Sequence, residues 1–208
     1  MAKLSGYPNG PLSYESEPAV ALRRTGGPDL SREKKVALCR CGGSRNKPFC
    51  DGTHAKIGFS DRNLADPKKD VRERYAGAKI TIFDNRSLCA HAGHCTDGLK
   101  EVFRMREEPW IAPDAASVDK VVETIRKCPS GALSYAIDGV EAAPPKRAPF
   151  VEVTDNGPYA VSGGVELAIG RWGEGASREH YTLCRCGMSK NKPFCDGSHW
   201  DVQFRDPA

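Results

Sequence analysis

The sequence predicts an α+β protein with two small β-rich units at the chain ends and a different α+β unit between them. A segment of about fifty residues occurs twice, at 9–59 and 156–204, and the residues between the copies do not resemble it. Gly (21) and Pro (15) are abundant, while only 39% of the chain is hydrophobic. Such a composition is typical of many turns around small cores, which need a metal or disulfides for stability.

The start of the first copy is marked by "NGPL" at Asn9, and that of the second by "NGPY" at Asn156. Strand-like, glycine-punctuated stretches follow at 19–27 and 165–175. The stretches "VALCRCG" and "YTLCRCG" then lead into the cysteines. Two copies in one chain are expected to pair about a pseudo-twofold axis, as protomers do in a symmetric dimer. We therefore expect a monomer with an internal pseudo-dimer.

The middle of the chain predicts a compact strand–helix–helix–strand unit. Residues 79–85 alternate like a strand, and 97–104 are expected to form a short helix. A longer helix is expected to begin near Pro113. Its apolar residues have helical spacing: Val118, Val121, Val122 and Ile125.

A second predicted strand, at 132–137, completes the middle unit, and the proline-rich stretch 141–149 reads as a stiff linker. The predicted units are therefore 1–65, 66–143 and 144–208.

Composition narrows the expected compartment and partners. The first residues lack the apolar core of a secretory signal, and no run of about eighteen apolar residues could span a membrane. We therefore expect a cytoplasmic protein whose nine cysteines stay reduced, and this odd number favours metal ligands over disulfides. The net charge is only +4 and the basic residues are spread out, so we expect neither a nucleic-acid nor a membrane partner.

The repeated motif is "CRCGGSRNKPFCDGTH" in the first copy and "CRCGMSKNKPFCDGSH" in the second, identical at thirteen of sixteen positions. Asp–Gly turns the chain between the last cysteine and the histidine. Each short segment can therefore supply a complete ligand set. The candidate ligands are Cys39, Cys41, Cys50 and His54 in the first copy and Cys184, Cys186, Cys195 and His199 in the second.

Three thiolates and one imidazole can hold either zinc or an iron–sulfur cluster. Zinc sites commonly separate the first two ligands by two to four residues. Only one residue separates them here, so the spacing favours a cluster and leaves zinc as the alternative.

The motif resembles the signature of the CDGSH iron–sulfur (mitoNEET-like) family, C-x-C-x2-[ST]-x3-P-x-C-D-G-[STA]-H, at every position in both copies. This resemblance implies a 2Fe–2S cluster in each copy. One iron would be held by the first two cysteines, and the other by the third cysteine and the histidine. The eukaryotic dimers of the family carry a membrane anchor, whereas this chain looks like a soluble tandem member.

Two further features of the motif bear on redox chemistry. A histidine ligand is expected to raise the reduction potential relative to four cysteines and to make the cluster acid-labile. Lys47 and Lys192 would stabilise a reduced cluster if they lay close to it, and they are otherwise solvated surface lysines.

The middle unit resembles a bacterial ferredoxin in which Ala92 replaces the second cysteine of C-x2-C-x2-C, with a distant Cys–Pro. This ferredoxin-like resemblance implies a third centre held by Cys89, Cys95 and Cys128, of the 3Fe–4S type. His91 or His94 as a fourth ligand would allow 4Fe–4S instead, and an empty unit is the remaining alternative.

Three functions follow as hypotheses. The first is one-electron transfer between unknown redox partner proteins. The second is a pH- or redox-sensitive donor of clusters to an apo acceptor, or a sensor. The third is a zinc-stapled interaction module. We expect no enzyme, because the sequence has neither a nucleotide-binding glycine motif nor a nucleophile with an evident base.

Overall fold

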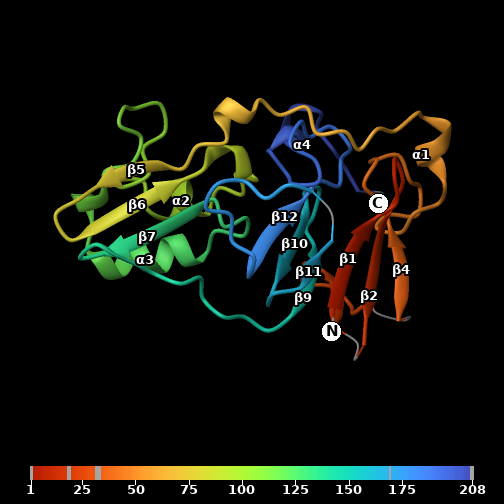
Figure 1. The fold of residues 1–208 in the computed structure, drawn as a ribbon, viewed down its shortest axis with the longest axis horizontal. Helices are drawn as coiled ribbons and strands as arrows, with labels where there is room; N and C mark the ends of the chain where they lie inside the picture. Colours follow the sequence, from red (N-terminus) through yellow and green to blue (C-terminus); the bar gives the residue numbers. More distant parts are fainter. Residues whose placement is uncertain (1, 18–19, 31–33, 169, 207–208) are drawn as a thin grey trace.

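Three four-stranded sheets connected by long loops and short helices make up the computed structural model, which describes residues 2–17, 20–30, 34–168 and 170–206. Figure 1 shows the sheet of the middle unit at one end, the sheet of the second copy in the centre and the sheet of the first copy at the other end. The prediction of a mixed α+β protein is confirmed.

The sheet of the first copy has the order β11-β1-β2-β4. Three of its strands belong to the first end unit (1–65) and are antiparallel: β1 (Ala2–Gly6), which precedes the repeated segment, and β2 (Leu12–Ser16) and β4 (Lys35–Leu38) within it. The fourth, β11 (Glu166–Leu167), comes from the second copy and pairs with β1 in parallel.

The sheet of the second copy has the order β12-β10-β9-β3. It contains β9 (Phe150–Val153), which precedes the second repeated segment, and β10 (Tyr159–Ser162) and β12 (His180–Leu183) within that segment. Its fourth strand, β3 (Ala21–Arg24), comes from the first copy and pairs with β9 in parallel. Each sheet thus takes one strand from the other copy, and a single buried core containing Leu4, Leu22, Val151 and Tyr159 spans both.

The strand-like stretches at 19–27 and 165–175 form shorter strands than expected. Within them the chain is extended only in β3 and β11. Gly26 and Gly170 adopt positive φ angles of 63° and 88°, which end an extended segment. Ala19 and Ile169, which belong to these predicted stretches, lie outside the described residues.

The sheet of the middle unit is antiparallel, with the order β5-β6-β7-β8. Its strands are β5 (Glu73–Ala76), β6 (Ile80–Asp84), β7 (Leu133–Ile137) and β8 (Val140–Glu141). Helix α3 (Val118–Arg126) packs its buried Val121 and Ile125 against this sheet, in a second core that also contains Ile80 and Ile82. The strand predictions at 79–85 and 132–137 are confirmed. The longer helix is present but begins at Val118, because Pro113–Ala115, where its start was predicted, forms a separate 3-10 turn.

The predicted helix at 97–104 is wrong. Helix α2 covers His94–Gly98 instead, and the chain then turns and pairs Phe103 with Ile111 in an isolated bridge. Gly98 is a poor residue on which to continue a helix. Val102 and Phe103 are both fully buried in the core, and the turn after α2 places them there.

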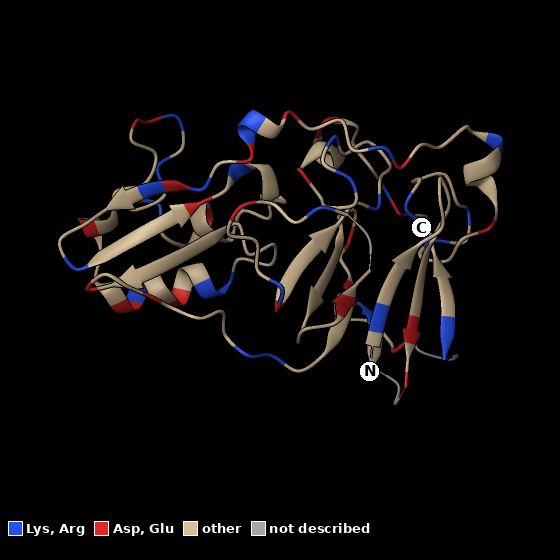
Figure 2. Ribbon diagram, viewed as in Figure 1, with Lys and Arg blue, Asp and Glu red and all other residues tan. Residues whose placement is uncertain are grey.

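The other helices are single turns. They are α1 (Thr53–Lys56), α4 (Ser198–Asp201) and 3-10 turns at Pro67–Lys69, Arg86–Leu88 and Pro113–Ala115. No helix in the described part of the chain has the length and apolar character needed to cross a bilayer. Basic and acidic residues are interspersed over all three units (Figure 2), so no unit carries a charge of one sign alone.

His180 lies at the contact between the second copy and the middle unit. Its ring is buried, its Nδ1 lies 3.2 Å from the Ser177 hydroxyl, and a Cβ on Gly131 would come within 3.4 Å of its Nε2. Burial, with a smaller contribution from the charge of Arg147, lowers the pKa of His180 to about 4. The folded protein therefore holds this imidazole neutral where the unfolded chain protonates it.

We expect His180 to make stability depend on pH between about 6.5 and 4. In this window the unfolded state binds more protons, so stability falls as pH falls, by about 3 kcal/mol over the whole window. Urea unfolding at several pH values, compared between the wild type and His180→Gln, measures this contribution, because other titrating groups cancel in the difference. Parallel pH profiles for the two proteins would contradict it.

Candidate metal centres

The first ligand set lies on a loop that folds back on β4. The Cys39 amide donates to the Pro48 carbonyl at 2.8 Å, and the Cys50 amide donates to the Ala37 carbonyl at 2.8 Å. This returns the third cysteine to the strand end that carries the first two. The Cys39 and Cys41 sulfurs lie 3.7 Å apart, and the Cys50 sulfur lies 3.3 Å from His54 Nδ1.

The second ligand set repeats this geometry. The Cys184 amide donates to the Pro193 carbonyl at 2.8 Å, and the Cys195 amide to the Thr182 carbonyl at 3.0 Å. The Cys184 and Cys186 sulfurs are 3.8 Å apart, and the Cys195 sulfur is 3.4 Å from His199 Nδ1. All eight predicted ligands are thus arranged as two Cys–Cys pairs and two Cys–His pairs.

This pairing suits a two-iron cluster better than a single zinc ion. Zinc in a structural site takes four ligands around one point, whereas the ligands of each set are grouped here as two pairs. A 2Fe–2S cluster instead needs two ligands on each of its two irons. The observed pairs are the ones predicted from the family resemblance.

The loops also supply backbone donors to the sulfurs. Gly43 donates to Cys41 Sγ and Gly52 donates to Cys50 Sγ, each at 3.4 Å. In each Cys–Cys pair, a hydrogen bond from one thiol lowers the pKa of the other. It lowers the pKa of Cys39 to about 6 and holds that of Cys186 below its usual range. One thiol in each pair is thus favoured in the thiolate form that binds metal.

Asp51 has a structural part in the first loop. Its carboxylate accepts hydrogen bonds from the Arg45 amide at 2.9 Å and the Thr53 amide at 3.0 Å. These bonds hold the pKa of Asp51 below its usual range, and the bond from the Arg45 amide has the largest effect. Asp196 accepts the equivalent bonds in the second loop, which is consistent with the expectation that both residues shape the loops.

The motif lysines join the two copies. Each ammonium group donates to the serine carbonyl three residues earlier at 2.8 Å. Lys47 also lies over the ring of Phe204 in the second copy, at 5.7 Å, and Lys192 over Phe59 in the first copy, at 5.9 Å. These cation–π contacts cross between the copies, a role that sequence reasoning missed.

The two ligand loops touch at a pair of glycines. A Cβ on Gly42 would lie 2.4 Å from the Cys186 carbonyl oxygen, and one on Gly187 would lie 2.5 Å from that of Cys41. Both glycines also have positive φ angles, 76° and 83°. Glycine is therefore required at both positions for the loops to approach.

Between its ligand cysteines, each loop buries an arginine that sequence reasoning also missed. Arg185 donates to both carboxylate oxygens of Asp206, at 2.7 and 2.5 Å, and to the Gly157 and Thr154 carbonyls. Arg40 has an equivalent but sparser set, which includes Asp61 at 2.8 Å. The sequence signal was the basic residue at the x of both C-x-C motifs.

The predicted ligands of the middle unit line one cavity of about 400 Å³. Cys89 follows a 3-10 turn, Cys95 lies in α2, and Cys128 follows α3. Burial, reinforced by the other two thiols, raises the pKa of Cys95 to about 11. Three thiols facing one cavity suit a site that a metal cluster would fill.

Other groups of this cavity bear on the third centre. Cys89 Sγ accepts from the His91 amide at 3.4 Å and lies 3.6 Å from Arg86 Nη1. Arg86 also stacks on Trp110 at 4.0 Å. Ala92 and His94 line the cavity as well. Arg86 was not anticipated, because nothing in its spacing distinguishes it from a surface arginine.

Comparisons with known proteins agree with these sites. Residues 9–55 and 156–200 match the family described as iron-binding zinc finger, CDGSH type, and residues 75–138 match the divergent 4Fe–4S mono-cluster family. The chain is similar to the uncharacterized protein YjdI of Escherichia coli K12 and of strain O157:H7. Each is 44% identical over 61 residues, which make up 29% of this chain and 80% of the relative. No solved structure matches the chain.

Proposed function

Because this chain belongs to the CDGSH iron-binding family and carries two of its domains around a divergent 4Fe–4S mono-cluster domain, we propose that it is a one-electron carrier between redox partner proteins. The observation that carries this proposal is the double set of Cys–Cys and Cys–His pairs. Each set would hold one 2Fe–2S cluster, and the middle cavity would hold a third centre. Such clusters supply reversible one-electron chemistry.

The placement of the ligands supports this role. The two CDGSH loops abut at Gly42 and Gly187, and the second copy lies between the first copy and the middle unit (Figure 1). The ordered strands beneath each loop hold the ligands in nearly the same geometry in both copies. The backbone donors to Cys41 and Cys50 stabilise negative charge on the sulfurs, which favours the reduced form.

For the middle unit we infer a 4Fe–4S centre with His94 as the fourth ligand. The family description names four irons, whereas three cysteines alone suit three. His94 lines the cavity, in the first turn of α2. His91 lines the cavity too, but its ring also lies against Gly197 of the second copy, which favours His94.

Replacing His54 or His199 with cysteine tests electron transfer at the end sites. We expect each variant to lower the reduction potential of one cluster only, by on the order of 100 mV, because histidine ligation raises the potential above that of all-cysteine sites. Potentiometric titration followed by visible absorption measures it, with iron and sulfide counted in each preparation. Unchanged potentials, or a colourless protein containing zinc, would refute the proposal.

Cluster donation to an apo acceptor protein is the second candidate. The half-burial of Cys41, Cys50 and His54 favours it, because a cluster must be reached to be passed on. Transfer to an apo-ferredoxin faster than unaided cluster loss would distinguish it from pure electron transfer.

A further inference from the structure

The two CDGSH sites have nearly the same sequence and ligand geometry but differ in exposure. Cys41, Cys50 and His54 of the first site are all half-buried. Their counterparts in the second site are buried: Cys186 is 8% exposed, Cys195 3% and His199 6%. Thirteen of sixteen motif residues are identical, and the one large change, Met188 in place of Gly43, leaves Met188 itself 56% exposed. The surroundings of each site therefore account for most of the difference.

The ligand loop of the middle unit covers the second site. A Cβ on Gly197 would come within 2.6 Å of the His91 ring, and the Trp200 indole donates to the His91 carbonyl at 3.2 Å. Trp200 also packs beside the ligand His199, with ring centroids 5.3 Å apart. These contacts link the loop that carries Cys89 directly to the loop that carries His199.

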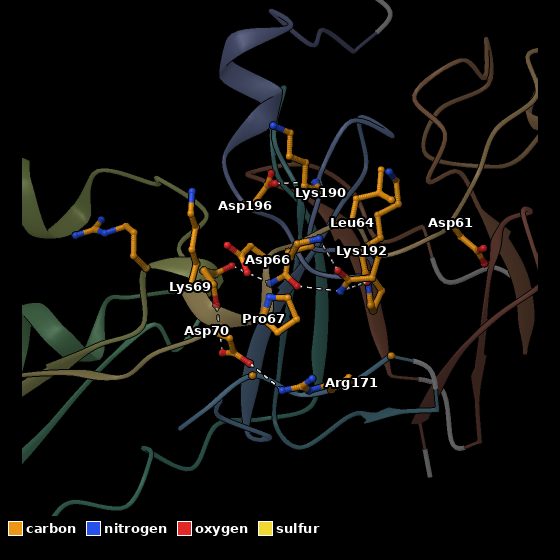
Figure 3. Close-up of a pocket in the computed structure, with 18 of the residues that line it drawn as sticks. Asp61, Leu64, Asp66, Pro67, Lys69, Asp70, Arg171, Lys190, Lys192 and Asp196 are labelled. Atoms are coloured by element: carbon orange, nitrogen blue, oxygen red, sulfur yellow. Dashed lines mark hydrogen bonds and ion pairs between the residues drawn. The ribbon is translucent and has the colours of Figure 1, made fainter.

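The segment that follows the first copy adds to this cover. The Leu64 amide donates to the Lys190 carbonyl at 2.7 Å, and Asn63 Nδ2 lies 3.0 Å from the Lys192 carbonyl. Figure 3 shows Leu64, Asp66 and Pro67 of this segment beside Lys190 and Lys192 of the second loop, at the edge of a cavity of about 1280 Å³.

The first site lacks these covers. A Cβ on Gly52, the counterpart of Gly197, would have no heavy atom within 4 Å. Ala55, which is exposed, stands where the second copy has Trp200. The middle unit lies on the far side of the second copy from this site (Figure 1).

We propose a division of roles between the two sites: outside partner proteins reach the first site, whereas the second site is sheltered by His91 and Trp200 and faces the middle unit. This inference rests on the proposed function, since it assigns different roles to its two end sites. It makes the middle unit the cause of the asymmetry.

Cluster loss with trapping of the freed cysteines tests the division. The iron-loaded chain is mixed at fixed pH with excess EDTA and iodoacetamide, and alkylated peptides are mapped by mass spectrometry over time. We expect Cys39, Cys41 and Cys50 to be alkylated at least tenfold faster than their counterparts in the second copy, because local access controls chelator attack. Equal rates, or a faster second site, would overturn the proposal.

Three variants test whether His91 and Trp200 cover the second site. Trp200→Ala and His91→Gly should each speed loss from the second site roughly tenfold, the effect of losing a hydrogen bond and a ring contact that keep the site closed. Glycine suits the positive φ of His91, 54°. Ala55→Trp is the matched control and should leave the first site unchanged, since no middle-unit loop lies there to bind the indole.

Two further results would contradict the proposed shelter of the second site. An unchanged second site in both cover variants, or a first site slowed by Ala55→Trp, would refute shelter by the middle unit. Either failure leaves electron transfer intact as long as both clusters are present and reducible. A chain without clusters would refute the proposed function itself, and iron and sulfide counts before mixing separate the two cases.

Discussion

Replacing Asp206 with alanine is expected to lower the free energy of unfolding by about 3–5 kcal/mol, because it leaves the buried charge of Arg185 without its partner. The Arg185 side chain is fully buried between the ligands Cys184 and Cys186, and both carboxylate oxygens of Asp206 accept from it. Urea unfolding of the cluster-loaded protein, followed by visible absorption and circular dichroism, measures the loss.

Asp61→Ala is the matched control in the first copy. Asp61 makes one contact with Arg40 at 2.8 Å and is 31% exposed, whereas Asp206 is 10% exposed. Each arginine keeps two carbonyl acceptors, those of Gly10 and Tyr7 for Arg40 and those of Gly157 and Thr154 for Arg185. The difference therefore comes from the number and burial of the carboxylate bonds that are lost. We therefore expect a smaller loss, about 1–3 kcal/mol. Equal losses in the two variants would show that burial of the ion pair does not set its contribution.

The ligand pairs could be predicted from the sequence because they are local. Cys39 and His54 are separated by fifteen positions, and the loop between them carries its own turn residues and proline. Helix α3 and strands β6 and β7 were predictable for a similar reason, since each displays its own apolar period over several residues.

The exchange of strands between the copies could not be predicted in the same way. Strand β3 has four residues and β11 has two. These are too few residues for an alternation of apolar and polar side chains to be recognised. Their partners lie more than a hundred residues away, in β9 and β1. Pairing at that distance is decided by the shared core, where Leu22 and Val151 are both fully buried.

The unequal exposure of the two sites could not be predicted from the sequence either. The motif copies differ at three positions, of which only Gly43 opposite Met188 is a large change, and the repeat alone predicts equivalent sites. The asymmetry arises from a contact between His91 and Gly197, in units that the sequence presents as separate. In the sequence, Trp200 opposite Ala55 and Met188 opposite Gly43 marked the difference.

Exchanging ligands in the middle cavity is expected to change the iron content of the chain by one atom. With a 4Fe–4S centre held by His94, the wild type carries about eight irons, and His94→Ala should retain about seven. Adding Ala92→Cys should restore about eight, because Ala92 lines the same cavity as the three cysteines and stands where ferredoxins have a ligand.

Iron and sulfide analysis with electron paramagnetic resonance decides between the alternatives. The oxidised three-iron centre has an odd number of unpaired electrons, so its signal should appear in His94→Ala and vanish when Ala92→Cys is added. Ala92→Ser is the size-matched control without a thiolate, and His91→Ala should leave the count unchanged. About seven irons in a wild type insensitive to His94→Ala would establish a three-iron centre instead. About four would mean that the middle cavity holds no cluster and that its thiols only pack.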